Sequence, residues 1–192
     1  MLEDKLRRIS KLKEKRERRN RKTMIFGSSH AKSIKRDEVN EELDMGTVDI
    51  IAYPGHTAQY ITKYMLPHLV EECPHTVVLV AGGNDIPRRR ATTKELETIA
   101  NHLIEGGKLC RENYGVTKVC ISSVLPRVFG DFQVNKHVLN RLLKDLCREN
   151  DLDFIDHSEN IILKHHIGRD GIHLNQTGCH LFTKNILECL NN

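Results

Sequence analysis

The sequence predicts an α/β protein in which a five-stranded parallel sheet lies between two layers of helices, a three-layer α/β/α sandwich. From Thr23 onward, short runs rich in β-branched residues alternate with longer segments of helical periodicity, and turn residues separate them. The third of these runs, TVVLVA, is apolar throughout, as expected for a strand covered on both faces. The chain has 192 residues, which suits one domain with a sizeable core better than two.

The expected elements follow in order along the chain. Strands are expected at residues 23–26, 48–52, 76–81, 117–122 and 153–156. Helices are expected at residues 31–43, 58–71, 93–113, 134–150 and 176–190. In the second helix, an apolar and aromatic stripe at helical spacing is expected to face the core: Tyr60, Ile61, Tyr64, Met65 and Leu69. Right-handed crossovers bring the loops that follow parallel strands to one edge of the sheet, where ligands bind in such folds.

The composition is that of an ordinary globular protein, with 39% hydrophobic and 29% charged residues. No run approaches the roughly eighteen apolar residues that a membrane-spanning helix needs. The basic N-terminus is not followed by the apolar segment of a secretory signal. An intracellular location, cytoplasmic or nuclear, is therefore expected.

Residues 1–22 form a basic extension ahead of a domain expected over residues 23–192. The extension holds eleven Lys and Arg against four Asp and Glu. Its apolar residues, Leu2, Leu6, Ile9 and Leu12, have the spacing of a short amphipathic helix. Three interpretations remain open: a solvated, partly helical segment, a nuclear-localisation or nucleic-acid contact site, and the end of a longer helix with a coiled-coil partner.

Six cysteines are scattered along the chain without any CxxC pair: Cys73, Cys110, Cys120, Cys147, Cys179 and Cys189. Several lie in apolar runs, so they are interpreted as reduced thiols of the core. A zinc site could be drawn from Cys73, His75, Cys179 and His180, but their spacing lacks the two close ligand pairs of a structural zinc site. No metal or cofactor is expected.

The first strand leads directly into Gly27, Ser28, Ser29 and His30, and then into a helix. A serine hydroxyl is thereby presented at a strand end and a helix N-terminus, where amide N–H groups point at bound anions. Ser28 and Ser29 compete for the role of nucleophile. The simpler alternative for such a serine is a helix cap.

Two further loops offer hydrogen-bond donors at the same edge of the sheet. Gly55, after the second strand, can donate a backbone N–H to a ligand or serve as an ordinary turn glycine. The segment Gly82–Asp85, after the third strand, places the amide of Asn84 on a flexible glycine pair. That amide can cap a turn or stabilise an oxyanion.

The last loop places Asp170 three residues before His173. A neutral imidazole can accept a hydroxyl proton on one nitrogen while a carboxylate holds the other, which fixes the tautomer. A lone Asp-x-x-His has a simpler explanation as a surface histidine. The four segments, however, follow one another along the chain on four loops that meet at one edge of the expected sheet. Together they supply a nucleophile, oxyanion donors, a base and an orienting carboxylate.

With these four blocks the sequence resembles the SGNH hydrolase superfamily, also called GDSL-like esterases and lipases, over residues 23–192. The resemblance implies a flavodoxin-like sheet and a serine esterase that needs no cofactor and acts on an acyl or acetyl ester of a lipid, carbohydrate or other small molecule. It implies a catalytic triad of Ser29, Asp170 and His173. The implied oxyanion hole consists of the Ser29 N–H, the Gly55 N–H and the Asn84 side chain.

One position departs from the family pattern, because Ser28 stands where the family usually has an aspartate before the nucleophile. This departure leaves an alternative function open. The domain can be a catalytically weakened binding module of a mobile-element-derived protein, with the basic extension in contact with nucleic acid. Similar esterase domains occur in some retrotransposon-encoded proteins, downstream of coiled coils.

Overall fold

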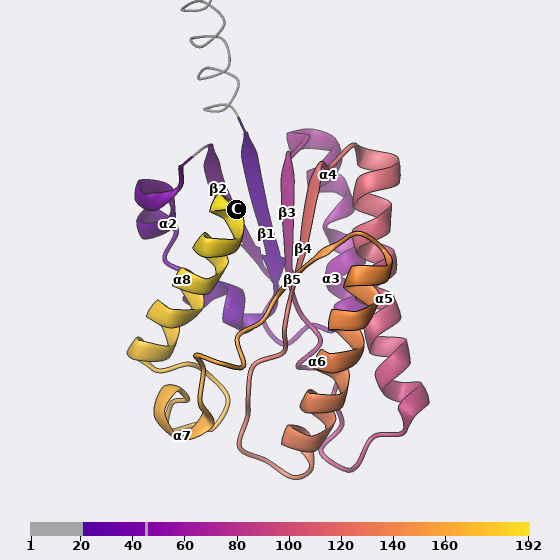
Figure 1. The fold of residues 1–192 in the computed structure, drawn as a ribbon, viewed down its shortest axis with the longest axis vertical. Coiled ribbons are helices and arrows are strands. Elements are labelled where there is room, and N and C mark those ends of the chain that lie inside the picture. The colour runs from indigo at the N-terminus through magenta and orange to yellow at the C-terminus, as the bar shows by residue number, and fades with distance from the viewer. Residues whose placement is uncertain (1–20, 45) are drawn as a thin grey trace, which may run out of the picture.

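A computed structural model describes residues 21–44 and 46–192, so the expected helix within residues 1–22 lies outside the described residues apart from its last two positions. The described chain forms one parallel sheet in the order β2-β1-β3-β4-β5 (Figure 1). Its strands are β1 (Lys22–Gly27), β2 (Thr47–Ala52), β3 (Thr76–Val80), β4 (Lys118–Ser122) and β5 (Asp153–Ile155). This order confirms the predicted flavodoxin-like arrangement.

Helices cover both faces of the sheet, as Figure 1 shows. One face carries the short 3₁₀ helix η1 (Ser29–Ser33), α2 (Arg36–Glu42) and α8 (Gln176–Asn191). The other carries α3 (Ala58–Tyr64), α4 (Leu66–Glu72), α5 (Thr93–Tyr114) and α6 (Phe132–Glu149). Successive strand residues alternate between the layers, since Met24 and Phe26 pack into one buried cluster and Ile25 into the other. The predicted three-layer α/β/α architecture is confirmed.

Two of the predicted helices are each divided in two. The helix expected at 31–43 is interrupted at Ile34 and Lys35, whose backbones are extended. Here the hydroxyl of Ser33 bonds the carbonyl oxygen of His30 at 2.6 Å, a side-chain bond that competes with helical continuation. The helix expected at 58–71 breaks at Met65, because Pro67 lacks the N–H that a continuous helix would use.

The predicted core stripe of α3 and α4 is only partly correct. Ile61, Met65 and Leu69 are buried, whereas the side chain of Tyr64 is 44% exposed. Tyr60 and Tyr64 stack on each other at 4.0 Å outside the core, and the ring of Tyr53 lies edge-on to that of Tyr60 at 5.7 Å.

The sheet order explains where a site can form. β1 and β3 are neighbours in space, yet the chain leaves β1 toward the α8 layer and leaves β3 toward α5. A crevice opens at such a switch point, beyond the carboxyl ends of the strands. Gly27 ends β1 at this point, and a Cβ there would lie 2.7 Å from the carbonyl oxygen of Val80, so a larger residue would push β1 and β3 apart.

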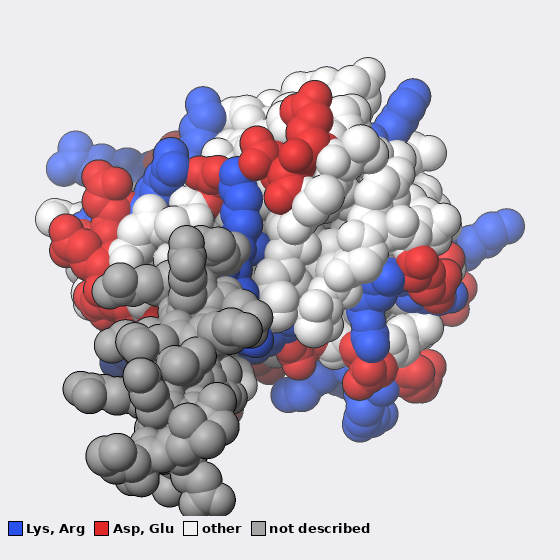
Figure 2. Space-filling model, turned by 90° about the horizontal axis from the view of Figure 1, so that it is seen from above, with Lys and Arg blue, Asp and Glu red and all other residues white. Residues whose placement is uncertain are grey.

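The opposite edge of the sheet, where the strands begin, is seen in Figure 2. Basic and acidic side chains are interspersed among the residues described on this face, rather than gathered by sign. Among the helices of residues 21–44 and 46–192, none combines the length and the apolar character that crossing a bilayer requires.

Candidate functional site

The predicted base and its orienting carboxylate form a hydrogen-bonded pair. Asp170 Oδ2 lies 2.6 Å from His173 Nδ1. The other carboxylate oxygen accepts the backbone N–H groups of Ile172 at 2.9 Å and His173 at 3.0 Å. The bond from the Ile172 N–H, with those from His173, holds the pKa of Asp170 well below its ordinary value. The carboxylate therefore stays ionised, the proton of the imidazole sits on Nδ1, and Nε2 is the free basic nitrogen.

This loop is fastened to its surroundings at two points. The Gly171 carbonyl oxygen accepts the Val128 N–H at 2.7 Å, which ties the loop to the segment after β4. The Ile172 carbonyl oxygen lies 3.0 Å from His30 Nε2, which ties it to η1. Burial lowers the pKa of His30 to about 4, so its ring is neutral at pH 7 with the proton on Nε2.

The two serines have different surroundings. Ser28 is buried, and its N–H donates to the carbonyl oxygen of Val80 at 3.0 Å. Ser29 begins η1 and is only half-buried. Neither serine caps the helix through a hydroxyl, since η1 has no side-chain cap bond. Among the described residues no hydrogen bond joins Ser29 to His173. The residue after Ser29, His30, has its ring centroid 5.8 Å from the ring centroid of His173, so the two segments are close in space.

The amide of Asn84 is held from both ends. Arg127 Nη2 donates to Asn84 Oδ1 at 2.9 Å, and Asn84 Nδ2 donates to the His56 carbonyl oxygen at 3.0 Å. The guanidinium can only donate, so it faces the amide oxygen, and the carbonyl oxygen can only accept, so it faces the amide nitrogen. Both contacts therefore fix the same orientation of the Asn84 amide. The second N–H of Nδ2 remains free within the described structure. The backbone N–H groups of Ser29 and Gly55 likewise donate to no described residue.

Arg127 is the site residue that the sequence analysis missed. It follows β4, is 5% exposed, and stacks its guanidinium over the Phe132 ring at 5.4 Å. A Cβ on Gly83 would lie 2.9 Å from Arg127 Nη2, so the glycine before Asn84 makes room for the guanidinium. Arg127 lies five residues beyond the end of β4, at the same sheet edge as the other site loops, but nothing in the sequence pairs it with Asn84.

Asp85 connects the loops after β2 and β3. Its carboxylate oxygens lie 2.9 and 3.2 Å from the N–H of Ala58, the first residue of α3. Burial raises the pKa of Asp85. The bond anchors the segment that contains Gly55 against the segment that contains Asn84, so both predicted oxyanion donors are held relative to β3.

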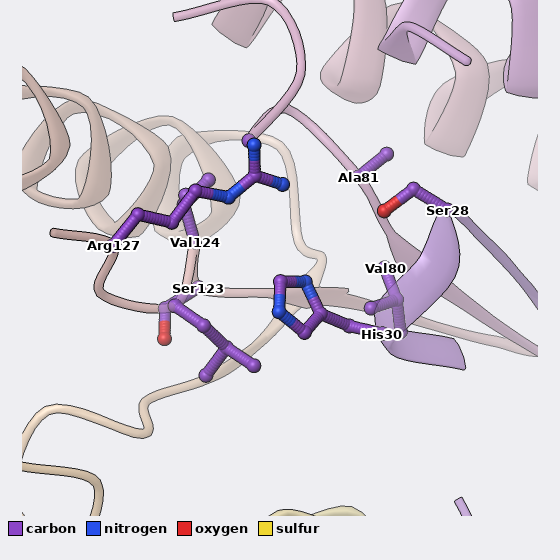
Figure 3. A pocket seen from close by; sticks show the side chains of 9 residues that line it. Ser28, His30, Val80, Ala81, Ser123, Val124 and Arg127 are labelled. Carbon is purple, nitrogen blue, oxygen red and sulfur yellow. The ribbon is translucent and has the colours of Figure 1, made fainter. Parts of the chain in front are cut away.

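A small cavity lies beside these groups (Figure 3). The side chains of Ser28 and His30 reach it from the junction of β1 and η1, and that of Arg127 from the segment after β4. Val80 and Ser123 complete much of its wall. Arg127 Nε is buried there without a hydrogen-bond partner among the described residues. The cavity thus has a cationic wall next to the serine that replaces the usual family aspartate.

A serine–histidine hydrogen bond does occur deeper in the protein, away from Ser29 and His173. His157 Nε2 lies 3.0 Å from Ser122 Oγ, and both side chains are buried. Asn185 Nδ2 lies 3.0 Å from His157 Nδ1, so that nitrogen accepts and Nε2 carries the proton. Burial lowers the pKa of His157 to about 3. Because Nε2 donates to Ser122, this imidazole cannot accept the serine proton. The chain Ser122–His157–Asn185 instead links β4, the segment after β5 and α8 as a structural element.

The four residues considered as zinc ligands do not assemble. Cys73 and His75 precede β3 at the edge where strands begin, whereas Cys179 and His180 lie in the first turns of α8, next to the loop of His173. The interpretation of all six cysteines as core thiols is wrong for Cys73, which is exposed at the end of α4.

No protein-family model and no curated protein matches the sequence. Among solved structures, the chain is similar to a lipase/acylhydrolase from Enterococcus faecalis, with 20% identity over 89% of this chain and 95% of that chain and a TM-score of 0.68. A GDSL-like lipase from Bacteroides thetaiotaomicron shares 16% identity over 88% of this chain and 87% of that chain, with a TM-score of 0.69.

An acetylxylan esterase from Geobacillus stearothermophilus shares 12% identity over 88% of this chain and 94% of that chain, with a TM-score of 0.70. These likenesses establish the fold and confirm the SGNH-type architecture that the four motif blocks predict. The link to retrotransposon-encoded domains stays a prediction, as does a nucleic-acid or coiled-coil contact through residues 1–22.

Proposed function

We propose that this chain, which has the fold of the SGNH hydrolases, is a serine esterase that hydrolyses a small ester through an acyl-enzyme. In this proposal Ser29 is the nucleophile, His173 the base and Asp170 the carboxylate that orients the base. The observation that carries the proposal is the 2.6 Å contact between Asp170 Oδ2 and His173 Nδ1. It leaves Nε2 as a basic nitrogen at the sheet edge where Ser29 begins η1.

The reaction proceeds in two halves. His173 Nε2 takes the proton of Ser29 as its Oγ bonds to the ester carbonyl carbon, and Asp170 stabilises the imidazolium that forms. The tetrahedral intermediate then expels the alcohol, which receives the proton from His173, and an acyl-serine remains. Water attacks the acyl carbon by the same route and releases the carboxylic acid and the free serine.

The oxyanion is met by three donors: the Ser29 N–H, the Gly55 N–H and Asn84 Nδ2. The absence of any other described acceptor for the two backbone groups supports this assignment. The two-ended clamp on Asn84 supports it further, since a preorganised donor costs no reorganisation when the charge develops. Arg127 is a positioning residue in this proposal, and its buried positive charge favours the developing negative one.

The structural neighbours support the reaction class. A lipase/acylhydrolase and an acetylxylan esterase both act on acyl esters, as their names state. A short-chain ester is therefore the appropriate first substrate for this chain.

Labelling by a fluorophosphonate probe, together with turnover of p-nitrophenyl acetate, tests the proposal. We expect the wild type to label and turn over, Ser29→Ala to lose both, and Ser28→Ala, the matched control, to keep labelling. Loss of labelling in Ser28→Ala alone would reassign the nucleophile by one residue. A folded wild type that neither labels nor turns over would refute the esterase proposal and favour the binding-module alternative.

A further inference from the structure

Two cysteines far apart in the sequence meet at the middle of β4. Cys120 Sγ and Cys189 Sγ are 3.3 Å apart, and both thiols are free. Cys120 is buried in the sheet, whereas Cys189, in the last turn of α8, is half-buried. Lys118, which contacts this turn, is the first residue of β4, so the pair lies toward the edge opposite the carboxyl-end loops.

The surroundings make the two sulfurs chemically unequal. Contact with the Cys120 thiol, and then the ammonium of Lys118, lower the pKa of Cys189. Contact with Cys189 and burial raise the pKa of Cys120. The Cys120 sulfur also lies 3.9 Å from Asp153 Oδ2, a carboxylate whose negative charge disfavours the Cys120 thiolate. Cys189 is thus the more accessible sulfur and the better nucleophile, and Cys120 is a protonated thiol directly behind it.

We propose that Cys189 and Cys120 form a peroxide-reactive dithiol site that closes into a disulfide between α8 and β4. The Cys189 thiolate attacks one oxygen of a hydroperoxide, so an S–O bond forms, the O–O bond breaks, and an alcohol or water leaves after taking up a proton. Cys120 sulfur then attacks Cys189 sulfur, the S–S bond forms, the S–O bond breaks, and water leaves with the Cys120 proton. The two thiols are oxidised and the hydroperoxide is reduced.

The geometry suits this pair of steps. A disulfide is about 2.05 Å long, so the sulfurs must approach by roughly 1.3 Å. Cys189 lies in the last turn of α8 and is half-buried, so its sulfur is close to the surface. Cys110 and Cys147, by contrast, are buried without a nearby second thiol, and burial raises their pKa to about 12.

A metal ion is the competing occupant. Cys120, Asp153 and Cys189 are the one group of three potential ligand side chains among residues 21–44 and 46–192. Two sulfurs on a tetrahedral zinc ion are about 3.8 Å apart, wider than the 3.3 Å found here. The ammonium of Lys118 lies 3.8 Å from Asp153 Oδ2 and would repel a divalent cation. The dithiol therefore fits the arrangement better.

Hydrogen peroxide titration of the full chain, read by intact mass and by dimedone trapping of sulfenic acid, tests the proposal. We expect the wild type to lose about 2 Da, the two thiol hydrogens, without a dimedone adduct. Cys120→Ser should accumulate the adduct at Cys189, because no thiol resolves the sulfenic acid. Cys189→Ser should form neither product, and Cys73→Ser, which removes an exposed and unpaired thiol, should behave as the wild type.

Two outcomes would overturn the proposal. One is a folded Cys120→Ser variant, verified by circular dichroism, that gives no adduct at Cys189. The other is purified wild type that carries a stoichiometric metal ion whose removal frees both thiols. Neither readout depends on ester hydrolysis, so the result is independent of the proposed esterase function.

Discussion

Replacing Arg127 with methionine tests how Asn84, the proposed oxyanion donor, is held in place. The substitution removes the 2.9 Å bond from the guanidinium to Asn84 Oδ1 and leaves only the bond from Nδ2 to the His56 carbonyl oxygen. A hydrogen bond from a charged donor contributes about 1.5–3 kcal/mol, against about 1 kcal/mol for a neutral one. We therefore expect kcat for p-nitrophenyl acetate to fall roughly 10- to 100-fold with little change in KM.

The stability of the same variant separates positioning from simple damage to the fold. Arg127 is buried, burial lowers its pKa, and its Nε has no partner among the described residues. The substitution relieves the cost of burying a charge but leaves Asn84 Oδ1 without its donor, so the two effects on stability oppose each other. Slower turnover with little change in Tm is the expected signature, measured by thermal unfolding beside the kinetics.

A double-mutant cycle decides the mechanism. Loss of a single oxyanion donor costs about 2.7–4 kcal/mol, so Asn84→Ala should lower kcat by roughly 100- to 1000-fold. If Arg127 acts through Asn84, the double variant should be little slower than Asn84→Ala alone. Rate losses that multiply in the double variant would refute the positioning role, as would a folded Arg127→Met enzyme with the wild-type kcat.

Three other predictions follow from the same structure. Gly83→Ala should lower kcat about as much as Arg127→Met, because its Cβ would lie 2.9 Å from Arg127 Nη2 and displace the guanidinium; a wild-type kcat would contradict this. Asp170→Asn should lower kcat on the order of 10³- to 10⁴-fold with little effect on Tm, because His173 loses the acceptor that fixes its tautomer; steady-state kinetics with thermal unfolding check it. Burial lowers the pKa of His30 to about 4 and of His157 to about 3, against about 6.5 unfolded, so the unfolded state binds more protons as pH falls. The free energy of unfolding should be highest above about pH 6.5, and at pH 5 it should be lower by roughly 2 kcal/mol for each histidine. Urea unfolding at pH 7 and at pH 5 measures this difference, and equal free energies of unfolding at the two pH values would exclude it.

The fold was predictable from the sequence because strands and helices each have a local residue pattern, apolar β-branched runs for the strands and helical periodicity for the helices. All five strands were located to within one residue at each end, since continuous β-branched runs such as Thr76–Val80 have no competing interpretation. The helices that divided did so at Ser33 and at Pro67. The bond from Ser33 to the His30 carbonyl oxygen depends on local geometry that periodicity does not encode, whereas Pro67 marks a break that the sequence itself contains.

The candidate site was predictable where its parts are close in sequence. Asp170 and His173 are three residues apart, so their pairing needs only a loop. The bond between Asn84 and Arg127 spans 43 residues and depends on how the loops after β3 and β4 fold together. The unequal sulfurs of Cys120 and Cys189 likewise arise from a contact that only the packed sheet and helix create.

The way Asp170 is fixed makes the His173 loop a self-contained part. The carboxylate is oriented by N–H groups of its own loop, so no distant residue is needed to build the base and its partner. If the loop shifts as a rigid piece, this pair keeps its internal geometry and only its distance from Ser29 changes. Hydrogen bonds to Val128 and to His30 hold the loop at that distance. Substitutions at these two contacts should therefore move the Asp170–His173 pair as a unit relative to Ser29, without taking the pair apart.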